Sequence, residues 1–433
     1  MTDYAIHKKR RAALLKRMGS GIAIVPTAPE VTRTADAHYD YRHDSNFYYL
    51  TGFREPGAVL VLEAGKKKQS ILFCRDKDPE REVWDGFRYG PEGAKEQFGF
   101  DETYSIAQLD EKLAELICDQ PVVYYPMGAN MAWDRRILKL RSAVQAKVRS
   151  GIRAPDELKD VRTLLHEMRL IKDMHEIAIM RRAAAISVTA HQRAMRYTRP
   201  DQYEYEVEAE LLHEFCRKGA RHPAYTSIVA GGANACTLHY VGNDAQLNDG
   251  DLLLIDAGCE LDGYAADITR TFPVNGKFSA AQKAVYEIVL AAQAAAIAAA
   301  KPGKSWNAPH DAALRVLAQG FIDLKLCRGS VDKVIEKEDY KRFYMHRTGH
   351  WLGMDVHDVG DYKVDGKWRK LEPGMVLTIE PGCYIRPAHN VPKKLWNIGI
   401  RIEDDVLVTA KGNEVLSKAA PKAVAEIEDL MKR

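Results

Sequence analysis

Cysteines, long apolar runs and a charge excess of one sign are all scarce in this 433-residue sequence. The seven cysteines are scattered and form no Cys-x-x-Cys pair, which favours reduced thiols in a cytoplasmic protein. No apolar run approaches the roughly 18 residues of a membrane span. The net charge is +3, so neither nucleic acid nor a membrane is an expected partner. The first residues predict an amphipathic helix with a solvated HKKRR face, not a secretory signal.

The length of the chain favours two domains, and the sequence pattern changes near residue 165. The first part mixes strand-like runs (GAVLVLEAG, QSILFCR, PVVYYP) with a helical run (AQLDEKLAELICDQ), which is typical of an α/β domain. Within it, YYLTGFREPGAVLVL predicts strand, turn and strand. The polar, irregular stretch at 151–165 predicts a domain joint. We therefore expect an N-terminal domain at 1–165 and a second domain at 166–433.

The second part predicts two pairs of helices, each followed by strands. The first pair covers 174–200, ending near Pro200, and 204–220. The second pair begins at Ser279, with Gln282 at capping-box spacing, and continues at about 306–326. A helix pair followed by strands, repeated once, indicates a duplicated α+β unit.

Two short segments of the second part support the duplication. LNDGDLLLIDAG at 247–258 and LEPGMVLTIEPG at 371–382 share Leu, Gly, Leu, Ile and Gly at equal offsets. In this alignment Asp256 falls opposite Glu380. Turn-plus-strand segments often look alike without common origin, but the matched carboxylates favour duplication.

Acidic residues inside apolar strands are costly unless their charge is compensated, and Asp256 ends such a strand. If Leu261 and Asp262 form the tip of a hairpin, Asp256 sits directly opposite Asp267. Like charges across a strand pair are destabilising, and a cation between them would remove the repulsion. The alternatives are a longer turn that separates the two acids, or arginines that pair them.

The second repeat carries the same unusual placement of acids. Glu380 ends MVLTIE, and Glu403 lies in IGIRIEDD with Arg401 on the same face. Four carboxylates with one or more histidines form a donor set for two metal ions that share an acidified water. Oxygen-rich donors with one imidazole favour Mn²⁺, with Co²⁺ and Zn²⁺ as alternatives.

The histidines of MHRTGHWLGMDVHD do not form a zinc pair on one helix. His346 and His350 have the i, i+4 spacing of a zinc-protease helix, but the intervening glutamate is absent. Thr348-Gly349 also interrupts any helix there.

Several ordered motifs resemble those of the pita-bread metallopeptidases, peptidase family M24. They are IDAGCELDGYAADITRTFPVNGKF, TGHWLGMDVHDVG, LEPGMVLTIEPGCYI and IGIRIEDD, within 166–433. In the first part, HYDYRHDSNFYYLTGFREPGAVLVL resembles the N-terminal domain of bacterial aminopeptidase P. The resemblance implies an α+β chain in which an α/β domain precedes a pseudo-twofold pita-bread catalytic domain.

The resemblance also implies roles for individual residues. The family's metal ligands fall on Asp256, Asp267, His350, Glu380 and Glu403, and Glu380 would deprotonate the attacking water. His239 and His357 would flank the substrate and stabilise the tetrahedral intermediate. His346 would support them, Arg401 and Tyr384 would lie behind the ligands, and Tyr225 would lie near the substrate.

The function implied is hydrolysis by a dinuclear metal-bridged hydroxide, which releases the N-terminal residue of peptides that carry proline at the second position. A prolidase restricted to Xaa-Pro dipeptides and a metal-free binding module of the same fold are the alternatives. Retention of all expected ligands disfavours the binding module. The resemblance further implies a homo-oligomer, either a dimer or a tetramer.

Overall fold

The computed structural model describes residues 4–65 and 67–432, and the chain divides into two compact units after Met168. The division falls inside helix α7 (Arg162–Leu170), the helix in which the sequence-based boundary after residue 165 also lies. Among the described residues, no helix is long and apolar enough to cross a membrane.

The N-terminal unit is built on one six-stranded sheet with the order β6-β5-β4-β1-β7-β8. Strand β1 pairs antiparallel with β4 and parallel with β7, so the sheet is mixed. The strands are β1 (Gly21–Pro26), β4 (Val59–Ala64), β5 (Gln69–Cys74), β6 (Glu102–Ser105), β7 (Val122–Tyr125) and β8 (Glu157–Asp160). A separate exposed hairpin joins β2 (Thr32–Thr34) and β3 (Ala37–His38).

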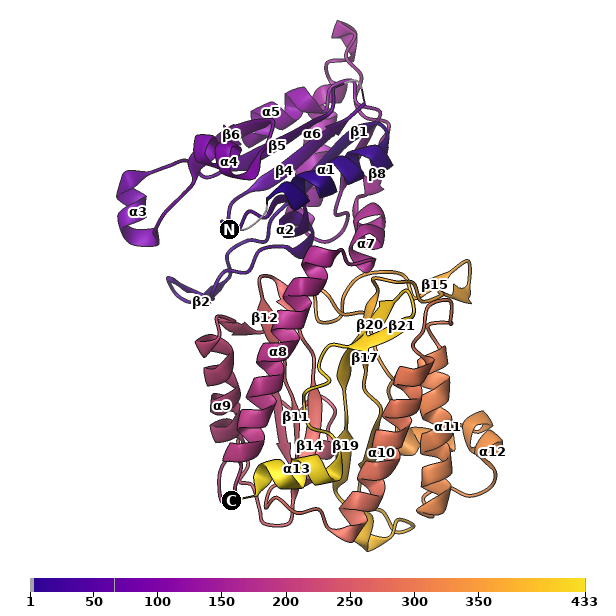
Figure 1. Cartoon of the computed structure of the whole chain (residues 1–433). Coiled ribbons are helices and arrows are strands. Elements are labelled where there is room, and N and C mark those ends of the chain that lie inside the picture. Colours follow the sequence, from indigo (N-terminus) through magenta and orange to yellow (C-terminus); the bar gives the residue numbers. More distant parts are fainter. Residues whose placement is uncertain (1–3, 66, 433) are drawn as a thin grey trace. The chain divides into compact units, whose positions relative to one another are not determined.

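The helices of this unit are α1 (Ala5–Met18), α2 (Ser45–Thr51), α3 (Pro79–Asp85), α4 (Gly90–Phe98), α5 (Leu109–Leu116) and α6 (Met131–Gln145), with 3₁₀ turns η1 (Ile106–Gln108) and η2 (Val148–Ser150). Alternate strand residues such as Ile22, Ile24, Val59 and Val61 form one core with α5 and α6. The intervening residues, such as Ala23 and Leu60, point to the opposite face and are buried as well, so both faces of the sheet are covered. The predicted α/β domain is confirmed (Figure 1).

Three local predictions for this unit were wrong. YYLT lies in α2 and not in a strand, because Asp44 accepts a hydrogen bond from Phe47 N at 2.8 Å and caps a helix that Gly52 ends in the left-handed conformation. The stretch predicted as an irregular joint contains the edge strand β8. The HKKRR run is not wholly solvated, because Arg11 is buried and donates to the carbonyls of Leu50 and Phe98.

The C-terminal unit repeats a pair of helices and a three-stranded sheet. The first repeat joins α8 (Met174–Tyr197) and α9 (Glu204–Arg217) to the sheet β10-β11-β14. The second joins α10 (Ala280–Ala299) and α11 (Ala308–Asp323) to the sheet β17-β20-β21. The strands are β10 (Ile228–Gly231), β11 (Leu252–Asp256), β14 (Thr269–Pro273), β17 (Val376–Ile379), β20 (Asp404–Thr409) and β21 (Gly412–Val415).

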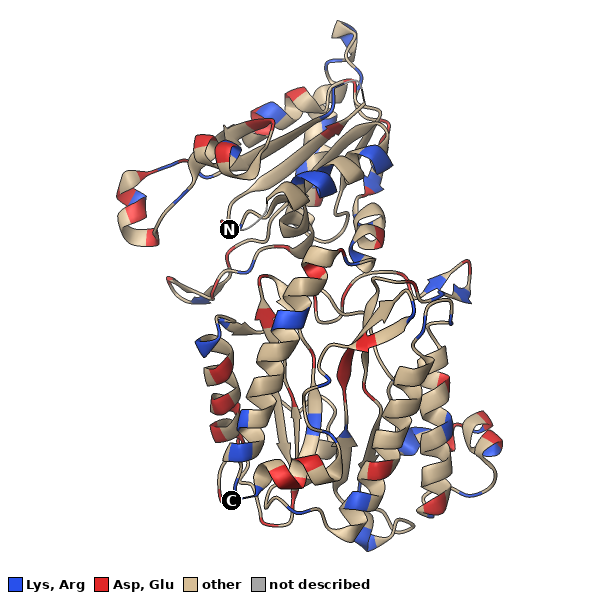
Figure 2. Ribbon diagram, in the orientation of Figure 1, with Lys and Arg blue, Asp and Glu red and all other residues tan. Residues whose placement is uncertain are grey.

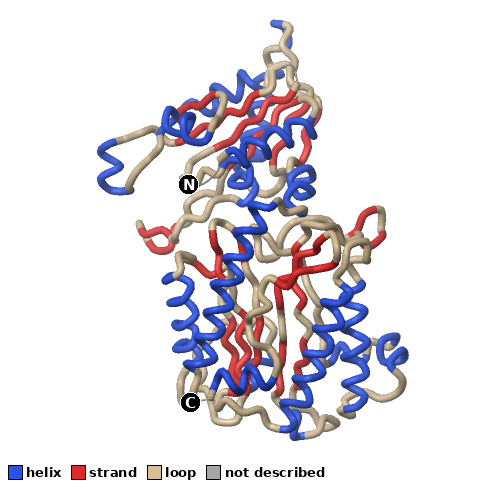
Figure 3. Tube along the Cα trace, viewed as in Figure 1, coloured by secondary structure: helices blue, strands red, loops and turns tan. Residues whose placement is uncertain are grey.

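The two helix pairs flank the strands of this unit, with α8 and α9 on one side and α10 and α11 on the other (Figure 3). Ser279 caps α10 in a capping box with Gln282, as its spacing predicts. The duplicated α+β architecture expected from the sequence is therefore confirmed.

Shorter elements complete this unit. The strands β18 (Gly382–Ile385) and β19 (Ile398–Arg401) pair with each other and carry the chain between β17 and β20. The remaining elements are β9 (His222–Pro223), β12 (Cys259–Leu261), β13 (Tyr264–Ala265), β15 (Lys363–Val364), β16 (Lys367–Trp368), α12 (Val331–Glu336), α13 (Val424–Met431), η3 (Gly232–Cys236), η4 (Asp339–Arg342) and η5 (Lys393–Leu395).

The hairpin that carries the first two acids differs from its prediction by one residue at the tip. Leu261 pairs with Tyr264, so Asp262 and Gly263 form the turn, both with positive φ. Asp-Gly suits a two-residue hairpin turn because both central residues need positive φ. As a result Asp256 pairs with Thr269 and not with Asp267. The prediction that Asp256 and Asp267 directly face each other across the strand pair was therefore wrong.

Candidate metal centre and active site

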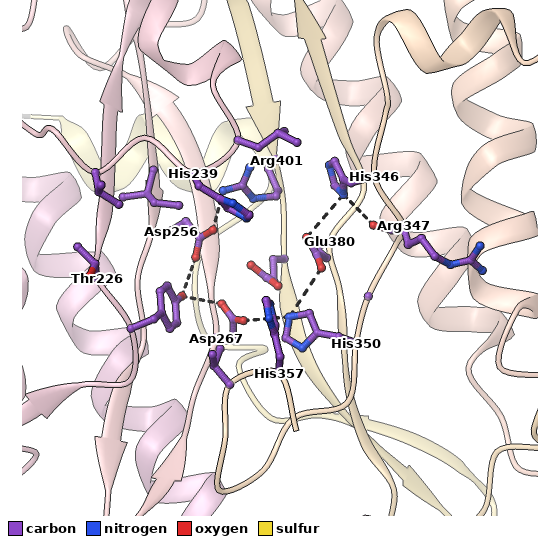
Figure 4. Close-up of a pocket in the computed structure, with 17 residues that line it drawn as sticks. Thr226, His239, Asp256, Asp267, His346, Arg347, His350, His357, Glu380 and Arg401 are labelled. Carbon is purple, nitrogen blue, oxygen red and sulfur yellow. Dashed lines mark hydrogen bonds and ion pairs between the residues drawn. The ribbon is translucent and has the colours of Figure 1, made fainter. Parts of the chain in front are cut away.

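A cavity of about 420 Å³ lies at the centre of the C-terminal unit, between the strands of the two repeats. Figure 4 shows the acidic and imidazole side chains converging on it from both repeats. Its lining combines charged donors with apolar side chains: Tyr225, Thr226, Ile228, Leu238, His239, Val241, Asp256, Asp267, His346, Arg347, Gly349, His350, Val356, His357, Glu380, Arg401 and Glu403. Among the predicted site residues, all but Tyr384 line the cavity.

The first repeat supplies two buried carboxylates, Asp256 and Asp267. Despite the shifted register they are close together, since the hydroxyl oxygen of Tyr225 lies 2.6 Å from an oxygen of each (Figure 4). A tyrosine hydroxyl carries one hydrogen and can donate to one carboxylate only. The second 2.6 Å contact therefore needs another positive charge, either a proton or a cation.

The imidazole of His350 faces the same acids. Its Nδ1 lies 2.9 Å from the carbonyl oxygen of Trp351, so Nδ1 carries a hydrogen and donates. Its Nε2 lies 3.3 Å from Asp267 Oδ2 and 3.8 Å from Glu380 Oε1. In the neutral ring, the Nε2 lone pair would point at carboxylate oxygens. This arrangement is stable with a proton on Nε2 or with a cation between the groups.

The second repeat supplies Glu380, directly after β17, and Glu403, directly before β20. Asp267, His350 and Glu403 each offer a donor atom within 4.8 Å of the others, a spacing that one metal ion can span. Glu403 Oε2 also accepts a hydrogen bond of 2.6 Å from the hydroxyl of Thr269. The matched carboxylates of the two repeats thus meet in one place.

Arg401 links the acids to the wall of the cavity. Its guanidinium donates to Asp256 Oδ2 at 2.6 Å, to the Tyr384 hydroxyl at 3.0 Å and to Thr269 Oγ1 at 3.2 Å. Tyr384 is fully buried behind the cavity and its hydroxyl also contacts His346 Nε2 at 2.9 Å. Arg401 and Tyr384 therefore fix neighbouring groups in orientation.

The pKa values reflect the surplus of negative charge. Burial, reinforced by the neighbouring acids, raises the pKa of Glu380 to about 7, against the opposing charges of His350 and Arg401. Burial and the other three acids raise the pKa of Glu403 well above its ordinary value. Burial acts to lower the pKa of His350, but its hydrogen bond with Asp267 and the acid charges raise it to about 9. Without a metal, the cluster retains protons that carboxylates and imidazoles release at neutral pH.

These observations fit a site for divalent cations. Four carboxylates and one imidazole face one another at distances that need positive charge, and buried uncompensated acids are costly. Hard oxygen donors with a single nitrogen suit divalent metals. Asp256, Asp267, Glu380, Glu403 and His350 are the residues that would hold them.

Three further histidines take different positions around the cavity. The ring of His357 packs edge-to-face on that of His350, with centroids 4.3 Å apart. His346 is held by Tyr384, and burial together with the charge of Arg401 lowers its pKa to about 3. His239 lies on the lining loop after η3 and is exposed. His239 and His357 are the more exposed pair, whereas His346 is partly buried beside Glu380, with Nδ1 at 3.8 Å from Glu380 Oε2.

Sequence reasoning missed two groups of residues. Thr269 joins Glu403 to Arg401, and its position two residues after Asp267 on a strand could have placed it on the same face. The apolar lining residues lie partly on β10 and on the loop after η3 and partly on a distant loop, and they follow no helix or strand period: Ile228, Leu238, Val241 and Val356.

Comparisons with known proteins find the same family over nearly the whole chain. Residues 178–410 match metallopeptidase family M24, and residues 7–124 match the aminopeptidase P N-terminal domain. The chain is 45% identical to the Xaa-Pro aminopeptidase of Escherichia coli, over 98% of this chain and 97% of that protein. It is 46% identical to the Xaa-Pro aminopeptidase of Haemophilus influenzae, over 98% and 96%.

Solved structures give the same result. The aminopeptidase PepP of Pseudomonas aeruginosa superposes with a TM-score of 0.97 at 52% identity, covering 99% of this chain and 98% of the other. The proline aminopeptidase P II of Yersinia pestis superposes with a TM-score of 0.96 at 47% identity, covering 100% and 99%.

Proposed function

Since the chain belongs to metallopeptidase family M24, we propose that it acts as a Xaa-Pro aminopeptidase, which releases the N-terminal residue of peptides with proline at the second position. One observation carries the chemistry: four carboxylates and His350 from two repeats converge in one cavity with too little positive charge of their own. The full-length likeness to Xaa-Pro aminopeptidases supports the substrate class.

We propose two divalent ions in this donor set, with Mn²⁺ preferred because oxygen donors predominate. Bound there, such ions lower the pKa of a coordinated water and polarise the scissile carbonyl. The net charge of four carboxylates matches that of two dications.

Glu380 is the group in this chain suited to move the proton. As a partly buried carboxylate on the wall of the cavity, it would accept a proton from the attacking water and return it to the departing nitrogen. It lies beside His350 and His346, at 3.8 Å from a ring nitrogen of each. His346, Tyr384 and Arg401 hold this side of the cavity in a fixed arrangement.

His239 and His357 would contact the peptide. Their rings reach the cavity, and an N–H of either can donate to the oxyanion that forms on the scissile carbonyl. Proline makes a tertiary amide without an N–H, so its recognition relies on the shape of the ring. The apolar side chains of Leu238, Val241 and Val356 supply a lining for such a ring.

An assay of the manganese-loaded protein on three substrates tests the proposal: Gly-Pro, a longer Xaa-Pro-Yaa peptide and a Met-Ala peptide. We expect the Xaa-Pro-Yaa peptide to be cleaved after its first residue and the Met-Ala peptide to be spared. Cleavage of Gly-Pro alone would identify a prolidase. Absence of hydrolysis with every divalent metal would favour the binding module.

We further propose that the chain self-associates. No residue of α3 is buried, and Val83 and Trp84 each expose 82% of their surface. Exposed apolar side chains of this size are typical of contact surfaces. Figure 2 shows acidic residues interspersed on the same helix. Light scattering of the wild type and of Trp84→Glu tests this: a dimer or tetramer that the variant weakens is expected, and a monomeric wild type contradicts it.

We also propose a cytoplasmic location, because all seven cysteines are free thiols and none is paired. Fractionation of the source cells with an antibody against the chain tests the location. Recovery with the membrane or secreted fraction would contradict it.

A further inference from the structure

His357 is positioned by its backbone and by one ring contact with His350. Within residues 4–65 and 67–432, its ring nitrogens have no hydrogen-bond partner, and the ring packs edge-to-face on that of His350. The side chain is exposed to the cavity. The direction in which the imidazole points is therefore set by the conformation of the loop at 351–360.

That loop is fixed by the next residue, Asp358, whose carboxylate is buried between two cations. Arg169 donates to Asp358 Oδ1 at 2.7 Å, and Lys172 Nζ lies 2.8 Å from Oδ2. The side chains of all three are at most 2% exposed. Asp358 N donates to Trp351 O at 2.9 Å, which closes the loop on itself.

The loop approaches the carboxylate and the 169–172 segment closely at two glycines. A Cβ added at Gly353 would lie 2.1 Å from Asp358 Oδ2 and 2.9 Å from Lys172 Cε. One added at Gly360 would lie 2.8 Å from the side chain of Leu170. The glycines let the 169–172 segment enter the loop, and Lys172 N is tied to Gly374 O at 2.9 Å. The two cations thus come from a segment that is itself fixed.

We propose that Lys172 and Asp358 are positioning residues for His357, so that the buried ion pair aims the imidazole at the substrate carbonyl. The proposal rests on the proposed function, in which His357 contacts the peptide. Neither Lys172 nor Asp358 lines the cavity, so they act through the loop and not by contact with substrate. A misplacement of about 1 Å can cost roughly 100-fold in rate, so the loss of this ion pair should be measurable as a fall in kcat.

A double-mutant cycle tests the coupling. Lys172→Met removes the ammonium group and keeps the chain length, and we expect kcat to fall by roughly 10- to 100-fold with little change in KM. In a His357→Ala background the same change should lower kcat by less than about twofold, because the group it positions is gone. Equal losses in both backgrounds would show a general structural role and overturn the proposal.

Chemical modification of His357 gives a readout independent of activity. Diethyl pyrocarbonate acylates accessible neutral imidazoles, and mass spectrometry of the digested protein follows each histidine. In Lys172→Met we expect the modification rate of His357 to change relative to wild type, while that of the exposed His389 stays the same. An unchanged His357 rate would contradict the positioning role even if the protein proved inactive on Xaa-Pro peptides.

Two further variants complete the test. Asp358→Asn keeps the shape of the side chain and replaces Lys172→Met if the latter fails to fold, with the same expected outcomes. Arg11→Met is a matched control, since Arg11 is a buried cation of the N-terminal unit that donates to carbonyl oxygens. It should leave the His357 modification rate unchanged. If His357→Ala itself retains full activity, the proposed contact between His357 and the peptide fails, whereas the modification experiment still decides the positioning.

Discussion

Glu403 and Asp404 are neighbours in sequence, both are buried carboxylates, and their surroundings are opposite. Asp404 meets Arg270 at 2.7 Å and Lys422 at 2.6 Å, and these cations outweigh burial and lower its pKa. Glu403 faces three other acids across the cavity, and burial together with their charges raises its pKa well above the ordinary value. Asp358 resembles Asp404, because two buried cations, Arg169 and Lys172, pair with its carboxylate.

The number of neighbouring cations distinguishes acids that the fold itself neutralises from acids that need a bound cation. At Asp404 and Asp358 the fold compensates a buried carboxylate with two neighbouring cations. The acids of the cavity share Arg401 and His350 among four carboxylates. Their shortage of positive charge is what a pair of divalent ions would correct.

The largest expected effect follows from removing a cavity acid. Asp267→Ala should lose bound metal and reduce kcat/KM by at least about 10³-fold, because bound metals would lower the activation barrier by several kcal/mol. The fold should persist, as circular dichroism would show. Metal content measured by inductively coupled plasma mass spectrometry is the readout, with Asp358→Asn as a control that keeps its metal. Full metal occupancy in Asp267→Ala would refute the ligand assignment.

The next effect is a change in the free energy of unfolding that has opposite signs for Asp404 and Glu403. Asp404→Asn should lower the free energy of unfolding of the metal-free protein by about 3–5 kcal/mol, since Arg270 is left buried and unpaired. Glu403→Gln should raise it, because the raised pKa of Glu403 means that folding forces this acid to take up a proton among three other acids, and glutamine removes that cost. Urea unfolding in a chelator measures both variants. A loss of stability in Glu403→Gln comparable to that in Asp404→Asn would remove the distinction between the two sets of acids.

Metal addition should stabilise the wild type by mass action. At a free Mn²⁺ concentration about 100 times the Kd, the gain is about 2.7 kcal/mol per site. Thermal melts with and without Mn²⁺ should therefore separate for the wild type and coincide for Glu403→Gln. A shift of equal size in both proteins would place the metal elsewhere.

The smallest expected effect is a pH dependence from a paired acid. Burial acts to raise the pKa of Asp358, but Lys172 and Arg169 outweigh it and lower that pKa below the ordinary 3.8. The stabilisation is therefore complete above pH 3.8 and is lost as the pH falls through the lowered value. Unfolding measured at about pH 2–5 should show a flatter dependence in Asp358→Asn than in wild type. Parallel curves would contradict the ion pairing.

Local patterns predicted much of the fold. Apolar runs such as GAVLVLEAG gave the strands of the first sheet, and Ser279 with Gln282 gave the start of α10. The failures occurred where two local signals competed. The YYLT segment has strand-forming residues, yet the Asp44 cap and Gly52 stop favour a helix. Asp262-Gly263 is itself a hairpin-turn signal, and it sets the observed register. The prediction placed the tip one residue earlier, at Leu261 and Asp262, and so gave the wrong register.

The candidate site was predictable in its acids but not in their supports. An acid at the end of an apolar strand, matched between repeats, is visible in sequence at Asp256 and Glu380. The partners of Asp358 lie 186 and 189 residues away, and no local pattern brings Lys172 or Arg169 to it. No local pattern brings to Arg11 the carbonyl oxygens of Leu50 and Phe98 that accept its hydrogen bonds. Such contacts depend on tertiary packing.

Anomalous diffraction from crystals soaked in Mn²⁺, recorded on both sides of the manganese absorption edge, tests the central claim most directly. We predict two manganese peaks in the cavity, roughly 3.5–4 Å apart, between Asp256, Asp267, His350, Glu380 and Glu403. Peaks elsewhere, or no peak in the cavity at saturating Mn²⁺, would contradict the claim that these buried acids are a metal site.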